Sequence, residues 1–219
     1  MEIILRIFTY GLPIVLAITL HEAAHGYVAL RYGDDTAKRL GRISLNPIRH
    51  MDLIGTILFP GFLLLMGSPV LFGYAKPVPV NFARLKNPRV DSIYVAGAGP
   101  AMNMLLAFIS ALLMHLLVFF PPAAGIIVKE MLNMSIFINV TLAVFNMIPI
   151  LPLDGGRVLL GFLPQKLAVP FSRLEPYGIF IVLGLLIIPT LLGFNVLAWL
   201  ILHPIKLLVE LISLLAGLS

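Results

Sequence analysis

The residues His21-Glu22-Ala23-Ala24-His25 fit the pattern HExxH. Residues four apart lie on one face of a helix, so both imidazoles can reach one tetrahedral zinc ion. Glu22 follows the first histidine and can contact a metal-bound water instead of the metal. Zinc lowers the pKa of such a water from 15.7 to about 7, and a nearby carboxylate can take the proton and pass it to a leaving amine. The pattern therefore predicts hydrolysis that depends on Zn²⁺, one ion per chain.

Asp154 is the candidate for a third ligand. Catalytic zinc commonly takes three protein ligands, and a chain without cysteine must supply them from His, Asp or Glu. Asp154 follows two prolines, Pro149 and Pro152, that break an apolar helix, and the pair Gly155-Gly156 permits a tight turn after it. The alternative is that Asp154 caps a short helix that begins near Gly155. Because the chain also contains the HExxH pattern, we favour the role of Asp154 as a metal ligand.

Composition places this chemistry in a membrane. The 219 residues form a single domain, 1–219, with 60% hydrophobic and 11% charged residues and a mean hydropathy of +1.04. Soluble domains are about half apolar and roughly a quarter charged. The bilayer is therefore the expected solvent, and the net charge of +5 indicates membrane topology and not a nucleic-acid partner. Ionisable residues inside a hydrophobic helix are usually functional, which strengthens the prediction for HExxH.

The chain is predicted to be an all-α polytopic membrane protein with about five to six apolar segments. A span needs about 20 apolar residues. The segments lie at about 3–30, 53–72, 92–120, 123–150, 177–192 and 196–215. We expect a catalytic core at about 3–160 and a C-terminal helical pair at about 175–217.

Basic residues set the expected topology. They gather after the first segment, before the third and after the fourth, and the positive-inside tendency places all three loops in the cytoplasm. The segment 53–72 then cannot cross, so we expect a re-entrant hairpin with its tip near Pro60-Gly61, shielded by protein or a water-filled cavity. An ordinary kinked span, with one basic loop outside, is the alternative.

The stretch Gly73–Val80 does not resemble a helix. Pro77 and Pro79, two residues apart among alternating valines, favour an extended edge strand, which could pair with an unfolded substrate segment. A plain connecting loop is the alternative. The expected substrate-binding residues are Lys76, Pro77, Val78, Pro79 and Val80. His50 is predicted to lie in a solvated loop, although it could instead line or gate the site.

Asn103 is an amide inside an apolar segment. Such a group costs free energy unless it is hydrogen-bonded. It could donate to an oxyanion that develops during peptide attack. The alternative is that Asn103 joins neighbouring helices, with Gly97 and Gly99 permitting close packing. We favour a role in catalysis.

Taken together, the motifs resemble the site-2 protease family. HExxH in an early membrane helix is followed by Gly97-Ala-Gly-Pro-Ala-Met-Asn103 and then by Asn146-x-x-Pro-x-x-Pro-Leu-Asp154-Gly-Gly, and the Tyr74–Val80 stretch is also similar to a segment of short bacterial and archaeal members. The resemblance spans roughly Leu20 to Arg157. It implies a three-helix catalytic core and cleavage of substrate helices within the membrane, with His21, His25 and Asp154 as zinc ligands and Glu22 as general base. It also implies that Asn103 and Asn146 bind the substrate backbone or the oxyanion.

The predicted function is therefore an intramembrane zinc metalloprotease that acts on transmembrane proteins. The sequence has no room for a PDZ domain between the helices, and no nucleotide-sensing domain follows. We expect an integral, multi-pass protein of a prokaryotic inner membrane with its active site toward the cytoplasm. The alternatives are a zinc-binding membrane protein without peptidase activity, which should lack Glu22, and a metal transporter, which should carry ligands along a path. Substrate identity and oligomeric state do not follow from the sequence.

Overall fold

The computed structural model describes residues 7–52, 76–191 and 196–218, together with positions 5, 55, 58 and 62. Within these ranges every regular element is helical, which confirms the all-α class. The predicted re-entrant hairpin at 53–72 lies almost entirely outside the described residues.

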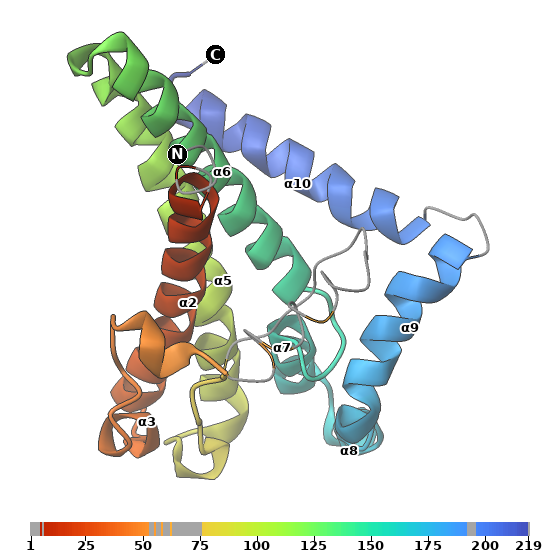
Figure 1. Cartoon of the computed structure of the whole chain (residues 1–219). Helices are drawn as coiled ribbons and strands as arrows, with labels where there is room; N and C mark the ends of the chain where they lie inside the picture. Colours follow the sequence, from red (N-terminus) through yellow and green to blue (C-terminus); the bar gives the residue numbers. More distant parts are fainter. Residues whose placement is uncertain are drawn as a thin grey trace.

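Three long helices form the body of the molecule (Figure 1). They are α2 (Leu12–Arg31), α5 (Pro88–Leu113) and α6 (Pro122–Asn146). The single-turn π-helix η1 (Ile7–Gly11) leads into α2, and the 3₁₀ segment η5 (Met114–Phe119) extends α5. Helices of 20, 26 and 25 residues are about 30–39 Å long, enough for a hydrocarbon core about 30 Å thick. The protein is therefore integral to a membrane.

Four helical stretches of the described chain are long and apolar enough to cross a bilayer: Phe8–Arg31, Pro88–Phe119, Pro122–Asn146 and Gln165–Leu185. The first three of these correspond to predicted apolar segments. The fourth stretch joins the short helix α8 (Gln165–Ser172) and the 3₁₀ turn η6 (Glu175–Tyr177) to the first part of α9 (Gly178–Leu191).

Small side chains hold the long helices together. Ala17, Ala107, Ala111 and Ala143 are each almost completely buried, and small residues let helix backbones approach closely in lipid, where the hydrophobic effect does not drive helix association. Large apolar side chains such as Phe119, which is 79% exposed, point outward, as expected for a protein whose solvent is lipid.

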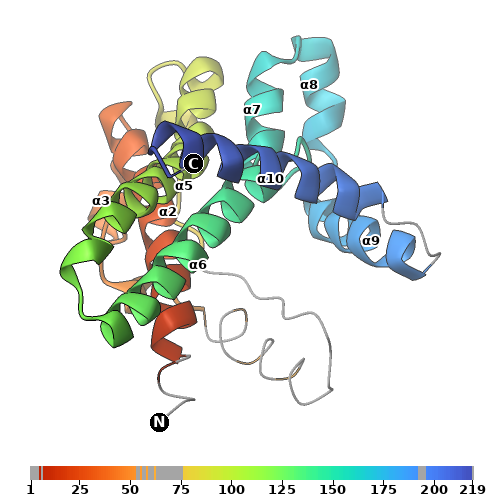
Figure 2. The same ribbon diagram turned by 90° about the horizontal axis from the view of Figure 1, so that it is seen from above.

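The chain turns back after α6. The short helix α7 (Asp154–Phe162) packs against α5, and α8 follows it. The last helix, α10 (Val196–Leu215), crosses α6 and packs on α5 and α6 through Ile205 and Ile212. Both views place α9 away from the bundle of α2, α5 and α6 (Figures 1 and 2). Helices α9 and α10 occupy the region predicted for a C-terminal helical pair.

Short elements cover one end of α2. They are α3 (Thr36–Arg39) and the 3₁₀ turns η2 (Pro47–His50) and η4 (Phe82–Arg84). Residues 76–81 run toward η4 without forming a strand. The predicted edge strand is therefore wrong for residues 76–80. Side chains of α2 and of the loop after it form hydrogen bonds with the backbone of this segment in place of a partner strand.

Candidate metal and catalytic site

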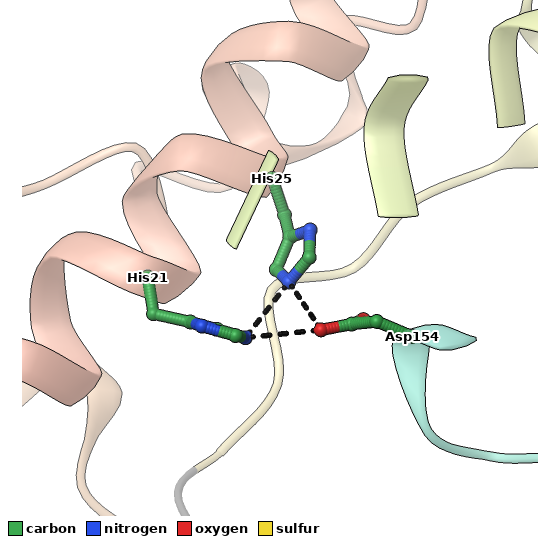
Figure 3. A group of neighbouring side chains, drawn as sticks. All are labelled: His21, His25 and Asp154. Atoms are coloured by element: carbon green, nitrogen blue, oxygen red, sulfur yellow. Dashed lines mark hydrogen bonds and ion pairs between the residues drawn. The ribbon is translucent and has the colours of Figure 1, made fainter. Parts of the chain in front are cut away.

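Three ligand atoms from two elements converge inside the molecule (Figure 3). His21 and His25 lie on α2, and Asp154 is the first residue of α7. The two histidine Nε2 atoms are 3.0 Å apart, and Asp154 Oδ2 lies 3.2 Å from Nε2 of His21 and 3.4 Å from Nε2 of His25. Three vertices of a tetrahedron around zinc, with bonds of about 2.0–2.1 Å, would be about 3.3–3.4 Å apart. The observed triangle therefore fits one zinc ion.

Hydrogen bonds at the far side of each imidazole strengthen this fit. His25 Nδ1 lies 2.7 Å from the carbonyl oxygen of Val95, which can only accept, so Nδ1 carries the proton. His21 Nδ1 lies 2.5 Å from Oδ1 of Asn103. With Nδ1 as the donor of each ring, Nε2 can offer a lone pair, and both Nε2 atoms face the buried Asp154 Oδ2, which has no hydrogen-bond partner. A metal ion between these three atoms would bind all of them, with the Nδ1 hydrogen bonds fixing the ring orientations.

Gly99 of α5 provides the space for the two imidazoles. A Cβ atom at this position would lie 2.4 Å from His25 Nε2 and 2.5 Å from His21 Nε2. No side chain fits between the helix backbone and the ligand atoms. The predicted small-residue contact at Gly99 therefore faces the metal ligands themselves.

A tightly folded turn delivers Asp154. Helix α6 ends at Asn146, and α7 begins at Asp154. A Cβ at Gly155 would lie 2.2 Å from the Met147 carbonyl oxygen, and one at Gly156 would lie 2.4 Å from the Leu151 backbone nitrogen. Both glycines are within α7, so close approach to the turn, and not a positive φ, requires them. The Leu151–Pro152 peptide bond in this turn is cis.

Asp154 does not cap α7. The N-cap position is Leu153, and no side-chain hydrogen bond caps the helix. The opposite end of α7 is fixed to α5 by Arg89, whose guanidinium donates to the carbonyls of Gly161 at 3.0 Å and Leu163 at 2.8 Å. A cation at a helix C-terminus satisfies carbonyls that lack partners within the helix. Helix α5 therefore fixes the helix that carries the third ligand.

Glu22 lies beside the cluster and is held by the segment of residues 76–81. The backbone N–H of Val78 donates to Glu22 Oε2 at 2.7 Å. The Val78 side chain is buried next to Gly26 and Ile43. The predicted substrate segment and the predicted base are thus in direct contact.

Residues 76–81 are attached to the rest of the protein at several further points. Lys76 N–H donates to the His50 carbonyl at 2.9 Å, Arg42 donates to the Lys76 carbonyl at 2.8 Å, and Asn81 N–H donates to Asp34 Oδ2 at 2.6 Å. Burial disfavours ionisation of Asp34, but hydrogen bonds from Thr36 and Asn81 outweigh it and hold the pKa of this carboxyl below its usual range. The segment is therefore anchored at both ends.

His50 is buried, with 2% of its surface exposed, so the prediction of a solvated loop position is wrong. Its Nε2 donates to the Ser44 carbonyl at 2.8 Å, and its own backbone carbonyl accepts from Lys76. His50 thus belongs to the packing under the 76–81 segment. Asn46 caps the 3₁₀ turn η2 that carries His50, since its side-chain oxygen accepts from the Ile48 N–H at 3.0 Å.

The two predicted asparagines differ in their surroundings. Asn103 is completely buried and contacts His21, and its amide nitrogen donates to Ala17 O at 3.2 Å and to Asn139 Oδ1 at 2.8 Å. Asn146 donates to Leu142 O of its own helix at 3.0 Å, and no described contact joins it to the cluster. Sequence reasoning missed Asn139, although an amide in an apolar helix needs a partner just as Asn103 does.

Known proteins with similar sequences indicate the family of this chain. A model of Peptidase family M50 matches residues 118–189, a range that includes Asp154. A protein of Bacillus subtilis named "Putative zinc metalloprotease YwhC" is 38% identical over 182 residues, which cover 81% of this chain and 80% of that protein. The chain belongs to peptidase family M50, the site-2 protease family. This confirms the family to which the sequence motifs pointed.

The M50 peptidase is also similar to mycobacterial proteins named "Putative zinc metalloprotease Rip2". The one from Mycolicibacterium smegmatis is 28% identical over 177 residues, covering 81% of this chain and 66% of that protein. The one from Mycobacterium tuberculosis is 27% identical over 188 residues, covering 85% and 70%. No solved structure gives a significant match. Family membership and the His-His-Asp cluster identify the M50 peptidase as a zinc metallopeptidase of the membrane.

Proposed function

We propose that this protein cleaves peptide bonds within or near transmembrane segments of membrane proteins, with zinc held by His21, His25 and Asp154. The supporting observation is the convergence of two histidine Nε2 atoms and one carboxylate oxygen within 3.0–3.4 Å of one another between apolar helices. Two imidazoles and a carboxylate suit zinc, and three protein ligands leave a fourth position open for chemistry.

Glu22 acts as the general base and acid in this proposal. Zinc, when bound, supplies a Lewis acid that polarises the scissile carbonyl and activates water. Val78 N–H holds Glu22 Oε2, so we assign proton transfer to Oε1. Glu22 takes a proton from the attacking water and later gives it to the leaving amine. The hydrogen bond to a fixed backbone segment limits the rotation of the carboxylate and keeps it next to His21.

The substrate must be locally extended at the cleaved bond. In a helix each inner carbonyl already accepts a hydrogen bond and is covered by neighbouring side chains. The backbone of residues 76–78 is engaged by Glu22, His50 and Arg42. We therefore place substrate contacts at Pro79 and Val80 and at the exposed side chains of Lys76 and Pro77.

Asn103 is assigned a positioning role and not the oxyanion role. Both of its N–H groups donate to protein acceptors, and its oxygen accepts from His21. Asn146 donates one N–H group to Leu142 O. It is the last residue of α6, where the turn that leads to Asp154 begins. We assign its second N–H group to the substrate backbone or the oxyanion.

The active site faces the cytoplasm of a prokaryotic cell in this proposal. The C-terminal end of α2, with α3, α7 and α8, lies at one end of the molecule (Figure 1). The basic residues Lys38, Arg39 and Lys166 belong to this end, and positive charge collects on the cytoplasmic side of inner membranes.

Metal analysis of Asp154→Asn tests the ligand set. Purified wild-type protein should carry about one zinc per chain. The amide keeps the size of Asp154 but loses its charge, so the variant should lose most of its zinc and its cleavage of membrane peptides. The control Glu210→Gln removes a carboxylate that is exposed on α10 and should keep both. Full zinc occupancy in Asp154→Asn would show that the Asp154 carboxylate is not a zinc ligand.

A further inference from the structure

A chain of buried polar side chains runs from the zinc site into α6. Asn103 Oδ1 contacts His21 Nδ1 at 2.5 Å, and Asn103 Nδ2 lies 2.8 Å from Asn139 Oδ1. Asn139 Nδ2 in turn lies 2.8 Å from the carbonyl oxygen of Ser135. Asn103 and Asn139 are 0% and 1% exposed. The chain thus connects α2, α5 and α6 in the apolar interior.

The proposed ligand set determines the direction of every hydrogen bond in this series. His21 turns Nε2 toward His25 and Asp154, so zinc ligation at Nε2 places the ring proton on Nδ1, and Asn103 Oδ1 accepts it. The amide nitrogen of Asn103 then donates to Ala17 O and to Asn139 Oδ1. Asn139 must accept with its oxygen and donate with its nitrogen, and the Ser135 carbonyl, which can only accept, agrees with this.

We propose that Asn139 is a positioning residue for the zinc site: by accepting from Asn103 it fixes the amide orientation that holds His21 in its metal-binding tautomer. This inference rests on the proposed ligand set. If the acceptor at position 139 is lost, one N–H group of Asn103 has no partner in an apolar interior. Only the contact of Asn103 Nδ2 with Ala17 O at 3.2 Å then still opposes rotation of the amide, and a rotated amide turns a donor toward His21 Nδ1. His21 would then favour the tautomer with its proton on Nε2, where zinc must bind.

The test uses the whole 219-residue protein in detergent and three variants of it. Asn139→Leu keeps the approximate volume and removes both polar atoms. Asn139→Asp, neutral in the apolar interior, keeps an oxygen that accepts from Asn103 and a hydroxyl that can donate to Ser135. Ser110→Ala is the matched control, because the Ser110 hydroxyl bonds to Ser135 Oγ at 2.7 Å between the same two helices and reaches Asn139 only through Ser135, whose Oγ lies 3.3 Å from Asn139 Nδ2.

Zinc affinity by chelator competition and the visible spectrum of the Co²⁺-substituted protein are the two readouts. Loss of a group that supports a metal-binding histidine weakens metal binding by about 10–100-fold, and we expect Asn139→Leu to weaken it by about 10-fold, the low end of that range. Its Co²⁺ spectrum should also change. Asn139→Asp should restore both properties to near wild type, and Ser110→Ala should leave both unchanged.

Two results would overturn the inference. One is wild-type zinc affinity and an unchanged Co²⁺ spectrum in Asn139→Leu. The other is an equal loss in Ser110→Ala, which would make the effect one of helix packing in general. If Asn139→Leu does not fold, failure of Asn139→Asp to bind zinc as the wild type does would decide against the inference. Absence of zinc from the wild-type protein would instead contradict the proposed function, so the two failures are distinguishable.

Discussion

At the scale of single residues, Gly99 shows how little space the site leaves. Its Cα faces the two histidine Nε2 atoms so closely that any side chain would occupy their positions. Gly97, two residues earlier in α5, has no atom within 4 Å of the place where a Cβ would lie. An alanine at either position changes the helix propensity of α5 in the same way, but only the one at position 99 would contact the metal ligands. The two substitutions therefore serve as test and control.

Gly99→Ala should abolish zinc binding, because the methyl group would displace His21 and His25 from the ligand position. Zinc bound per chain and cleavage of a transmembrane peptide should both fall at least about 10-fold, as expected when the support of metal ligands is disturbed. Gly97→Ala should keep the metal and the activity. Equal zinc contents in the two variants would show that the histidines do not lie against Gly99.

The sequence predicted His21, Glu22 and His25 because helix geometry alone puts residues four apart on one face. Asp154 was found because the prolines and glycines around it mark a break in an apolar helix. The contact between Asn103 and His21 could not be predicted in the same way. It depends on how far α5 is shifted along α2, which no local pattern determines. Asn139 lies in an apolar run without any motif, so its partner is visible only in three dimensions.

At the scale of elements, the turn between α6 and α7 is held from two sides. On one side Arg89 of α5 binds the C-terminal carbonyls of α7. On the other, the start of α9 rests on the turn, since a Cβ at Gly178 would lie 1.9 Å from the Leu151 carbonyl oxygen. Arg157 of α7 also pairs with Glu175 and lies over the ring of Phe82 at 4.6 Å. The C-terminal region therefore supports the element that carries Asp154.

Gly178→Ala should therefore weaken zinc binding although Gly178 is not near the ligands in sequence. The added methyl group must push the Leu151 carbonyl away, and Asp154 follows three residues later. We expect about a 10-fold weaker zinc affinity, similar to the loss of an indirect support of a metal ligand, measured by chelator competition. Gly125→Ala in α6, where the nearest atom is 3.8 Å away, is the control. Unchanged zinc affinity in Gly178→Ala would show that α9 does not support the position of Asp154.

The predicted strand at 73–80 shows where local patterns fail. Alternating valines and prolines correctly excluded a helix at residues 76–80, but the described partners of these residues are single groups, mostly side chains, and not a strand. Arg42, Glu22 and Asp34 form hydrogen bonds with the backbone of residues 76, 78 and 81, respectively. These partners lie 34 to 56 residues earlier in the chain, so the sequence around the segment contains no sign of them.

At the scale of the whole molecule, the apolar composition and the basic loops make a prediction about topology. The chain has no cysteine, so single cysteines at positions 38, 86 and 166 can be labelled without background. All three should react with a membrane-impermeant maleimide from the cytoplasmic side, because basic loops remain there. Labelling of position 86 only from the outside would make residues 53–72 a true span and contradict the re-entrant hairpin.

The central claim is that Glu22 transfers the proton in a zinc-dependent peptide hydrolysis. Glu22→Gln keeps the side-chain size, both histidines and an oxygen that can accept from Val78 N–H. The amide cannot take a proton from water. The direct measurement compares wild type and Glu22→Gln in liposomes with a labelled transmembrane peptide that has a helix-breaking Gly-Pro pair at its centre, and zinc is determined in the same samples.

We expect equal zinc contents and a cleavage rate that is about 10²–10⁴-fold lower in Glu22→Gln, the usual contribution of general acid–base catalysis. The peptide should still bind to the variant, because the segment 76–80 and the metal ligands are unchanged. Cleavage by zinc-loaded Glu22→Gln at the wild-type rate would contradict the account.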